Sequence, residues 1–191
     1  MTRNCDNVSY KASGRMLPDN TWVWEPVTWT KCWCGLFHSN RHIPDKFWDR
    51  TWEKKKGPKL SAGIMLWKES SNGRRKFFMV QSYGNLFGFP KGSLDPKEEY
   101  FDGALREFYE ETGTNIKIDK KKCLEIRKVI GDNRVSIFVI KVPKDFEIKT
   151  QPKADVEISA YGFIDEYSLR YYKTNRVTRD TIEIINKSKK W

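Results

Sequence analysis

The pattern of apolar and polar positions becomes regular after residue 59, where segments of strand length alternate with turns. Strands are predicted at residues 61–69, 76–84, 123–131, 134–142 and 160–165, with a short strand and turn at residues 85–90. Asn72-Gly73 lies between the first two strands and is typical of a hairpin turn. A second turn is predicted at Asp132-Asn133, between the next two strands.

One longer helix and two short helices complete the predicted elements. Pro96 suits the first turn of a helix, because the backbone donor that proline lacks is not needed there. The helix is expected to run to about Thr112, with Gly113 supplying the stop. Residues 167–173 and 177–187 are predicted as short helices. The order of strands, helix, strands and terminal helices predicts an α+β fold with a mixed sheet.

Residues 1–59 differ from the rest and are interpreted as an N-terminal extension or small subdomain, ahead of a main domain at residues 60–191. This segment has little helical or strand periodicity but is rich in tryptophan, at Trp22, Trp24, Trp29, Trp33, Trp48 and Trp52. It ends in the run KKKGPK, whose charge and Gly-Pro pair are typical of an exposed linker.

Composition narrows the compartment and the partners. No segment reaches the roughly 18 apolar residues of a membrane span, and the N-terminus lacks the apolar core of a secretory signal. We therefore expect an intracellular protein in which the four cysteines remain thiols. The net charge of +11 indicates a polyanionic partner. Basicity alone does not choose among RNA, DNA, an inositol polyphosphate and an anionic membrane.

Three acids near the end of the predicted long helix indicate a metal site. Glu107, Glu110 and Glu111 are spaced i, i+3 and i+4, so a helix brings their carboxylates to one face. Like charges clustered in this way destabilise a bare helix. A cation that prefers oxygen ligands removes the penalty, and Mg²⁺ held by carboxylates and substrate phosphates is common in phosphoryl chemistry.

The same acids belong to a longer motif that resembles the Nudix box. Its positions are Gly92, Glu98, Arg106, Glu107, Phe108, Glu110, Glu111 and Gly113, with Thr114 in place of the usual apolar residue. The flanking segment FMVQSYGNLFGFPKGSLDPKEE, residues 78–99, is similar to the catalytic subunit of eukaryotic mRNA decapping enzymes and to related proteins of large DNA viruses. The resemblance implies a Nudix fold, in which helices sandwich a mixed sheet.

The resemblance also implies residue roles. The carbonyl of Gly92 and the carboxylates of Glu107, Glu110 and Glu111 would hold Mg²⁺ or Mn²⁺, and Glu110 is counted among the catalytic residues. Lys91 in the GFPKG turn would stabilise charge on the phosphates, or else is an ordinary turn lysine.

Two further roles follow from the same resemblance. Glu98 and Arg106 would brace the box internally. Glu157, just before the last strand, would act as general base or additional metal ligand. Glu147 and Asp155 compete with Glu157 for that role, and a plain surface glutamate is the other interpretation.

The function implied is hydrolysis of the 5′ cap of mRNA to 7-methyl-GDP and 5′-monophosphate RNA. The partner would be capped RNA rather than a membrane, in the cytoplasm, or in the host cytoplasm if the chain is viral. RNA-binding residues would be Arg176, Arg179, Lys187, Lys189 and Lys190, unless they form a solvated helix face. Protein activators stay undefined, since residues 1–59 do not resemble the decapping enzyme's regulatory domain.

Two other functions are compatible with the sequence. The enzyme alternative is a diphosphoinositol polyphosphate or dinucleoside polyphosphate hydrolase, and the other class is an inactive Nudix scaffold that binds RNA. Cap stacking or core packing are both open for the N-terminal aromatics Trp22, Trp24, Trp29 and Phe37. A structural zinc site is a further possibility for Cys32, Cys34, His38 and His42, although Cys-x-Cys is tighter than the usual spacing.

Overall fold

The computed structural model describes residues 14–16, 22–24, 28–32, 35–39, 59–82, 86–148 and 158–188. Within these ranges the strands form a two-stranded and a nine-stranded sheet. The small sheet pairs β1 (Gly14–Met16) with β2 (Trp22–Trp24). The strands of the large sheet are β3 (Trp29–Lys31), β4 (Phe37–Ser39), β5 (Leu60–Glu69), β6 (Arg75–Ser82), β7 (Leu86–Gly88), β8 (Lys91–Ser93), β9 (Leu124–Ile130), β10 (Asn133–Lys141) and β11 (Ala160–Asp165).

The large sheet is mixed, as the order of elements predicted. Its strands lie in the order β3-β4-β11-β6-β5-β10-β9, while β7 pairs with β6 and β8 pairs with β5. The central strands β5 and β10 are parallel, and the other pairs in the sheet are antiparallel. The strands β3 and β4 come from the predicted N-terminal extension and continue this sheet through β11.

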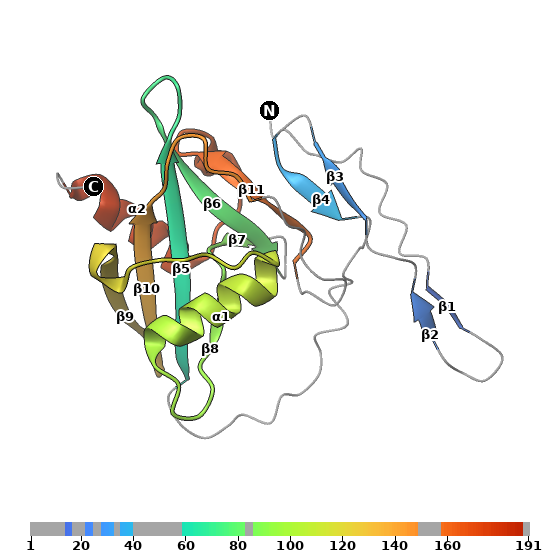
Figure 1. Ribbon diagram of the computed structural model, residues 1–191, viewed down its shortest axis with the longest axis horizontal. Helices are drawn as coiled ribbons and strands as arrows, with labels where there is room; N and C mark the ends of the chain where they lie inside the picture. The colour runs from blue at the N-terminus through green and yellow to red at the C-terminus, as the bar shows by residue number, and fades with distance from the viewer. Residues whose placement is uncertain are drawn as a thin grey trace.

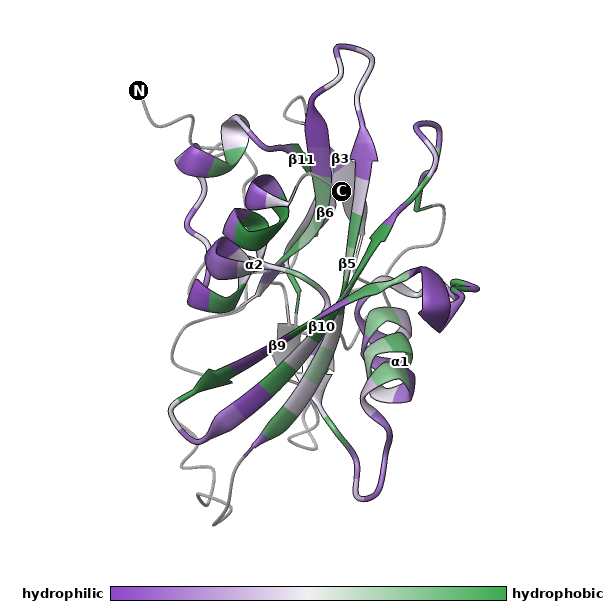
Figure 2. Cartoon of the chain, turned by 90° about the vertical axis from the view of Figure 1, so that its left-hand side faces the viewer, coloured by the Kyte–Doolittle hydropathy of each residue, from purple (hydrophilic) through white to green (hydrophobic). Residues whose placement is uncertain are grey.

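Two helices cover opposite faces of the sheet (Figures 1 and 2). Helix α1 (Tyr100–Thr112) buries Phe101, Ala104 and Phe108 against one face, and α2 (Arg176–Lys187) buries Ile185 against the other. Alternation along β5 supplies both cores, because successive side chains of a strand point to opposite faces. Ala62, Ile64 and Leu66 pack with α1, whereas Met65 and Trp67 lie in the cluster with Ile185. The predicted sandwich of helices around a mixed sheet is therefore confirmed.

Helix α1 begins later than the sequence predicted. It starts at Tyr100 with Glu99 as the N-cap, so Pro96 lies in the preceding turn rather than in the first helical turn. The reason is Lys97, whose φ of 68° is in the left-handed region and interrupts a right-handed helix. The predicted end is correct: Gly113 adopts φ 68° and its N–H donates to the carbonyl of Tyr109.

The terminal helices and the strand β8 complete the frame of the site. The predicted short helices correspond to a 3₁₀ turn, η4 (Ser168–Tyr171), and to α2, and a further 3₁₀ turn, η3 (Lys120–Lys122), precedes β9. The strand β8 was not predicted; it pairs antiparallel with residues 61–63 of β5. This pairing places the chain just before α1 alongside the central strand. Among the described residues no helix is long and apolar enough to cross a membrane.

Candidate active site

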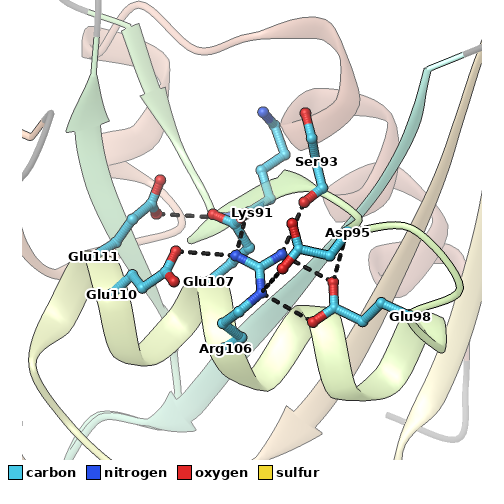
Figure 3. A network of polar contacts seen from close by, with 8 residues as sticks. All are labelled: Lys91, Ser93, Asp95, Glu98, Arg106, Glu107, Glu110 and Glu111. Atoms are coloured by element: carbon cyan, nitrogen blue, oxygen red, sulfur yellow. Dashed lines mark hydrogen bonds and ion pairs between the residues drawn. The ribbon is translucent and has the colours of Figure 1, made fainter.

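The candidate site lies where β8 passes the face of helix α1. The helix carries Glu107, Glu110 and Glu111 on the side that faces Lys91 and Ser93 (Figure 3). The chain leaves β8, makes the turn at residues 94–99 and enters α1, so both sides of the site come from one continuous segment. Pairing of β8 with β5 anchors the first half, and burial of Phe101 and Phe108 anchors the second.

Arg106 is the centre of the polar network in Figure 3. Its guanidinium donates to both carboxylate oxygens of Glu98, at 2.9 Å each, and to the backbone carbonyl of Ser93 at 2.9 Å. The nitrogen Nη1 donates to Glu107 and to Glu110, each at 3.0 Å. One planar group thus fixes the turn before the helix relative to two acids on the helix.

The carboxylate of Glu107 packs directly on the backbone of Gly92. A Cβ atom added at Gly92 would lie 2.0 Å from Oε2 of Glu107, so any side chain there would require the Glu107 carboxylate or the backbone to move. Burial raises the pKa of the Glu107 carboxyl above its ordinary value, although the hydrogen bond and charge of Arg106 oppose this. The pKa of Glu98 is lowered instead, chiefly by its hydrogen bond to Arg106. Glu107 is therefore a carboxylate whose charge is poorly solvated.

The other two acids are held by different partners. The side chain of Glu110 is 53% exposed and is paired with Arg106. An oxygen of Glu111 accepts the backbone N–H of Lys91 at 3.2 Å. In this arrangement no three Asp, Glu, His or Cys side chains of the described segments converge into a group that could hold a metal ion. Binding of one ion by all three acids would require their carboxylates to move together.

The chemistry of these donors suits a divalent cation such as Mg²⁺ or Mn²⁺. All of them are oxygen atoms, which hard cations prefer, and three carry negative charge on one helix face. A nearby cation would offset the burial that raises the pKa of the half-buried Glu107 carboxyl. The donor chemistry of these residues therefore fits a hard divalent cation, while the three carboxylates do not converge in this structure.

Of the other residues predicted to take part in catalysis, only some lie within the described residues. The half-buried Lys91 contributes its backbone to Glu111, and its side chain extends away from α1 in Figure 3. Glu157 and its competitor Asp155 lie outside the described residues. Glu147 is exposed; burial lowers the pKa of the Lys68 amine on β5, and the charge of Glu147 opposes that shift.

The predicted RNA-binding residues lie on and beyond α2. Arg176, Arg179 and Lys187 are exposed, and Lys187 pairs with Glu183 at 2.6 Å. Lys189 and Lys190 are outside the described residues. The described part of this basic group therefore lies along one helix, opposite the face of the sheet that α1 covers.

The N-terminal residues considered for cap stacking or zinc binding lie only partly within the described residues. Phe37 is half-buried and stacks on Tyr161, with ring centroids 5.0 Å apart and planes at 9°, so it packs against the core. The side chains of Trp22, Trp24 and Trp29 are not described. Cys32 is a half-buried thiol, and burial lowers the pKa of His38. Their proposed zinc partners, Cys34 and His42, fall outside the described residues, so zinc stays a prediction.

Two contributors to the site were not predicted. The carbonyl of Ser93 accepts from Arg106, and Asp95 lies 3.6 Å from its Nε. A backbone acceptor leaves no signal in a sequence. An aspartate next to proline is read as a turn residue, so its charge was not assigned to the network.

We expect Arg106→Lys to lower the free energy of unfolding by about 1–3 kcal/mol, because a lysine has one nitrogen and cannot bridge Glu98, Glu107 and the Ser93 carbonyl. The measurement is thermal unfolding, with a fall in Tm of roughly 2–4 °C per kcal/mol. Arg127→Lys is the matched control, since the Arg127 side chain is 77% exposed and its pair with Glu125 contributes little. Equal Tm values for both variants would show that the Arg106 network does not stabilise the fold.

The fold and this constellation define a Nudix domain. A NUDIX domain family model matches residues 57–182, and the chain belongs to that family. The m7GpppN-mRNA hydrolase dcap-2 of Caenorhabditis elegans is 36% identical over 92 residues, which are 46% of this chain and 12% of that protein. The chain thus spans a small part of the length of this relative.

Solved structures show the same fold at low sequence identity. The NUDIX domain of NrtR from Shewanella oneidensis, complexed with ADP ribose, is 13% identical with a TM-score of 0.51, covering 75% of this chain and 97% of that one. A bifunctional NMN adenylyltransferase/ADP ribose pyrophosphatase from Francisella tularensis, complexed with AMP and a manganese ion, is 15% identical with a TM-score of 0.53, covering 68% and 41%. These likenesses concern the fold alone.

Proposed function

We propose that this Nudix hydrolase cleaves the pyrophosphate linkage of the 5′ cap of mRNA and releases 7-methyl-GDP and 5′-monophosphate RNA. The observation that carries the proposal is the 36% identity to an mRNA cap hydrolase over 92 residues. The acids of α1 and the Gly92–Glu107 contact supply a site of the right chemistry. The net charge of +11 suits a long polyanionic substrate.

The site is proposed to work with Mg²⁺ or Mn²⁺. Gly92 through its carbonyl, and Glu107, Glu110 and Glu111 through their carboxylates, are the residues that would hold the metal. When bound, such an ion neutralises phosphate oxygens and lowers the pKa of water. Arg106 holds Glu107 beside Gly92 and also contacts Glu110, so it would position two of the three acids.

Two residues are assigned to proton and charge handling. Lys91 lies in the GFPKG turn and is proposed to place a positive charge next to the phosphate oxygens of the substrate. Glu157 is proposed as the base that takes the proton from the attacking water, or as a further ligand. The exposed position of Glu147, with its charge acting on Lys68, makes it the weaker candidate for that role.

The test is hydrolysis of RNA with a radiolabelled cap by the purified chain in Mg²⁺ or Mn²⁺, with products separated by thin-layer chromatography. Free cap dinucleotide, a dinucleoside polyphosphate and a diphosphoinositol polyphosphate serve as rival substrates. We expect 7-methyl-GDP from capped RNA at a higher kcat/KM than any small substrate gives. Preference for a small polyphosphate would overturn the decapping proposal but would leave the assignment as a hydrolase intact. No turnover of any substrate would favour an inactive scaffold that binds RNA.

A further inference from the structure

Two arginines and two tyrosines form an exposed stack on the opposite side of the sheet from α1. The guanidinium of Arg170 lies 3.6 Å from the ring centroid of Tyr167 and 4.8 Å from that of Tyr171. Arg74, from the hairpin between β5 and β6, lies 5.5 Å from the same Tyr167 ring. We call Arg74, Tyr167, Arg170 and Tyr171 the Tyr–Arg stack. It joins a hairpin tip to η4, segments that are far apart in the sequence.

The stack is unusually exposed for aromatic residues. Tyr167 is 54% and Tyr171 57% exposed, and both arginines are also exposed. Two acids that precede Tyr167 accept backbone N–H groups: Asp165 accepts that of Tyr167, and Glu166 accepts that of Arg75. The side chain of Arg170 is hydrogen-bonded to Tyr167 and Tyr171, so the guanidinium and the two exposed rings are held together as one unit.

We propose that the Tyr–Arg stack binds single-stranded RNA of the substrate, through base stacking on Tyr171 and the guanidiniums and through contacts of Arg74 and Arg170 with phosphates. Aromatic rings and guanidinium planes are the groups on which unpaired bases stack, whereas paired bases present no free face. The proposal rests on the proposed function, because it is the body of a capped RNA that would reach this surface.

A backbone hydrogen bond links the segment after the stack to the segment that leads to Lys91. Lys173, two residues after Tyr171, accepts at its carbonyl the N–H of Phe87 at 2.8 Å, and Phe87 lies four residues before Lys91. Because a chain extends at most about 3.6 Å per residue, Tyr171 lies within roughly 30 Å of Lys91.

Basic residues continue from the stack toward α2. Lys173, Arg176 and Arg179 follow the stack and are all exposed. These side chains extend the positive charge beyond the stack, on the face of the sheet opposite α1, where the phosphates of an RNA body would be attracted.

The test measures binding of uncapped, 5′-monophosphate single-stranded RNA by fluorescence anisotropy, so it needs no turnover. Arg170→Ala and Tyr171→Leu are expected to weaken binding about 5- to 100-fold, the range for loss of one stacking partner. Tyr171→Phe keeps the ring and is expected to bind like the wild type. Arg170→Lys keeps the charge and is expected to keep the salt dependence while losing about 5-fold in affinity.

Arg127→Ala is the charge-matched control, because it removes an exposed arginine on the edge strand β9 and should leave RNA affinity nearly unchanged. All the substituted side chains are exposed, so the Tm of each variant should match that of the wild type. With capped substrates, Arg170→Ala should raise KM for long RNA and leave hydrolysis of the cap dinucleotide unchanged.

The outcomes separate this inference from the proposed function. Weaker RNA binding by Arg170→Ala and Tyr171→Leu supports the stack even if the wild type proves unable to cleave a cap, which would overturn decapping alone. Wild-type affinity in both variants overturns the stack as an RNA site. Equal affinity of the wild type for duplex and single-stranded RNA overturns base stacking.

Discussion

Glu110→Gln is expected to reduce hydrolysis by about 10²–10³-fold while leaving RNA affinity and Tm unchanged. The carboxylate is one of three on the face of α1 that lies against β8, and Glu110 is exposed whereas Glu107 and Glu111 are half-buried. Glutamine keeps the shape but removes a negative charge from the oxygen that would bind a cation. Metal-assisted stabilisation is worth several kcal/mol, which corresponds to this loss in rate.

Stability should not change in this variant, because an exposed i,i+4 ion pair such as Arg106–Glu110 contributes little to folding. The measurement is single-turnover cleavage of capped RNA, with RNA binding and thermal unfolding measured on the same preparation. Glu99→Gln is the matched control: it makes the same change at the exposed N-cap of the same helix, where the side chain makes no capping hydrogen bond. Normal turnover by Glu110→Gln would sink the assignment of these acids to catalysis.

The arrangement of the acids on α1 could be predicted because it depends on helix geometry alone. The i, i+3, i+4 spacing brings Glu107, Glu110 and Glu111 to one face, and Figure 3 shows all three on the side of α1 that faces Lys91. The end of the helix could also be predicted, since Gly113 is the residue type that favours a left-handed C-cap. Such features are local, so the sequence carries them directly.

Features set by distant neighbours could not be predicted. The segment Lys91–Ser93 has no apolar alternation and becomes a strand only because β5 pairs with it. The start of α1 depends on the left-handed conformation of Lys97, which lysine rarely adopts. The guanidinium of Arg106 bridges the turn and the helix acids because β8 and α1 meet, and a long flexible side chain shows no such preference in the sequence.

Gly92→Ala is expected to lower turnover about 10²-fold with little effect on overall folding. The added Cβ would lie 2.0 to 2.2 Å from all three atoms of the Glu107 carboxylate. No heavy atoms approach this closely without a bond, so either the carboxylate or the backbone of β8 has to move. A displacement of about 1 Å at a catalytic constellation costs on the order of 10² in rate. Capped-RNA cleavage at saturating metal and substrate measures the effect as a fall in kcat.

The adjoining residue provides the control. Ser93 is exposed and contributes its backbone carbonyl to Arg106, so Ser93→Ala keeps that hydrogen bond and should retain activity. Circular dichroism and Tm should be close to the wild type in both variants, because the core clusters on either side of the sheet do not include Gly92. A Gly92→Ala protein with wild-type kcat would show that Glu107 can leave Gly92 without consequence, and Glu107 would then have no part in positioning the reacting groups.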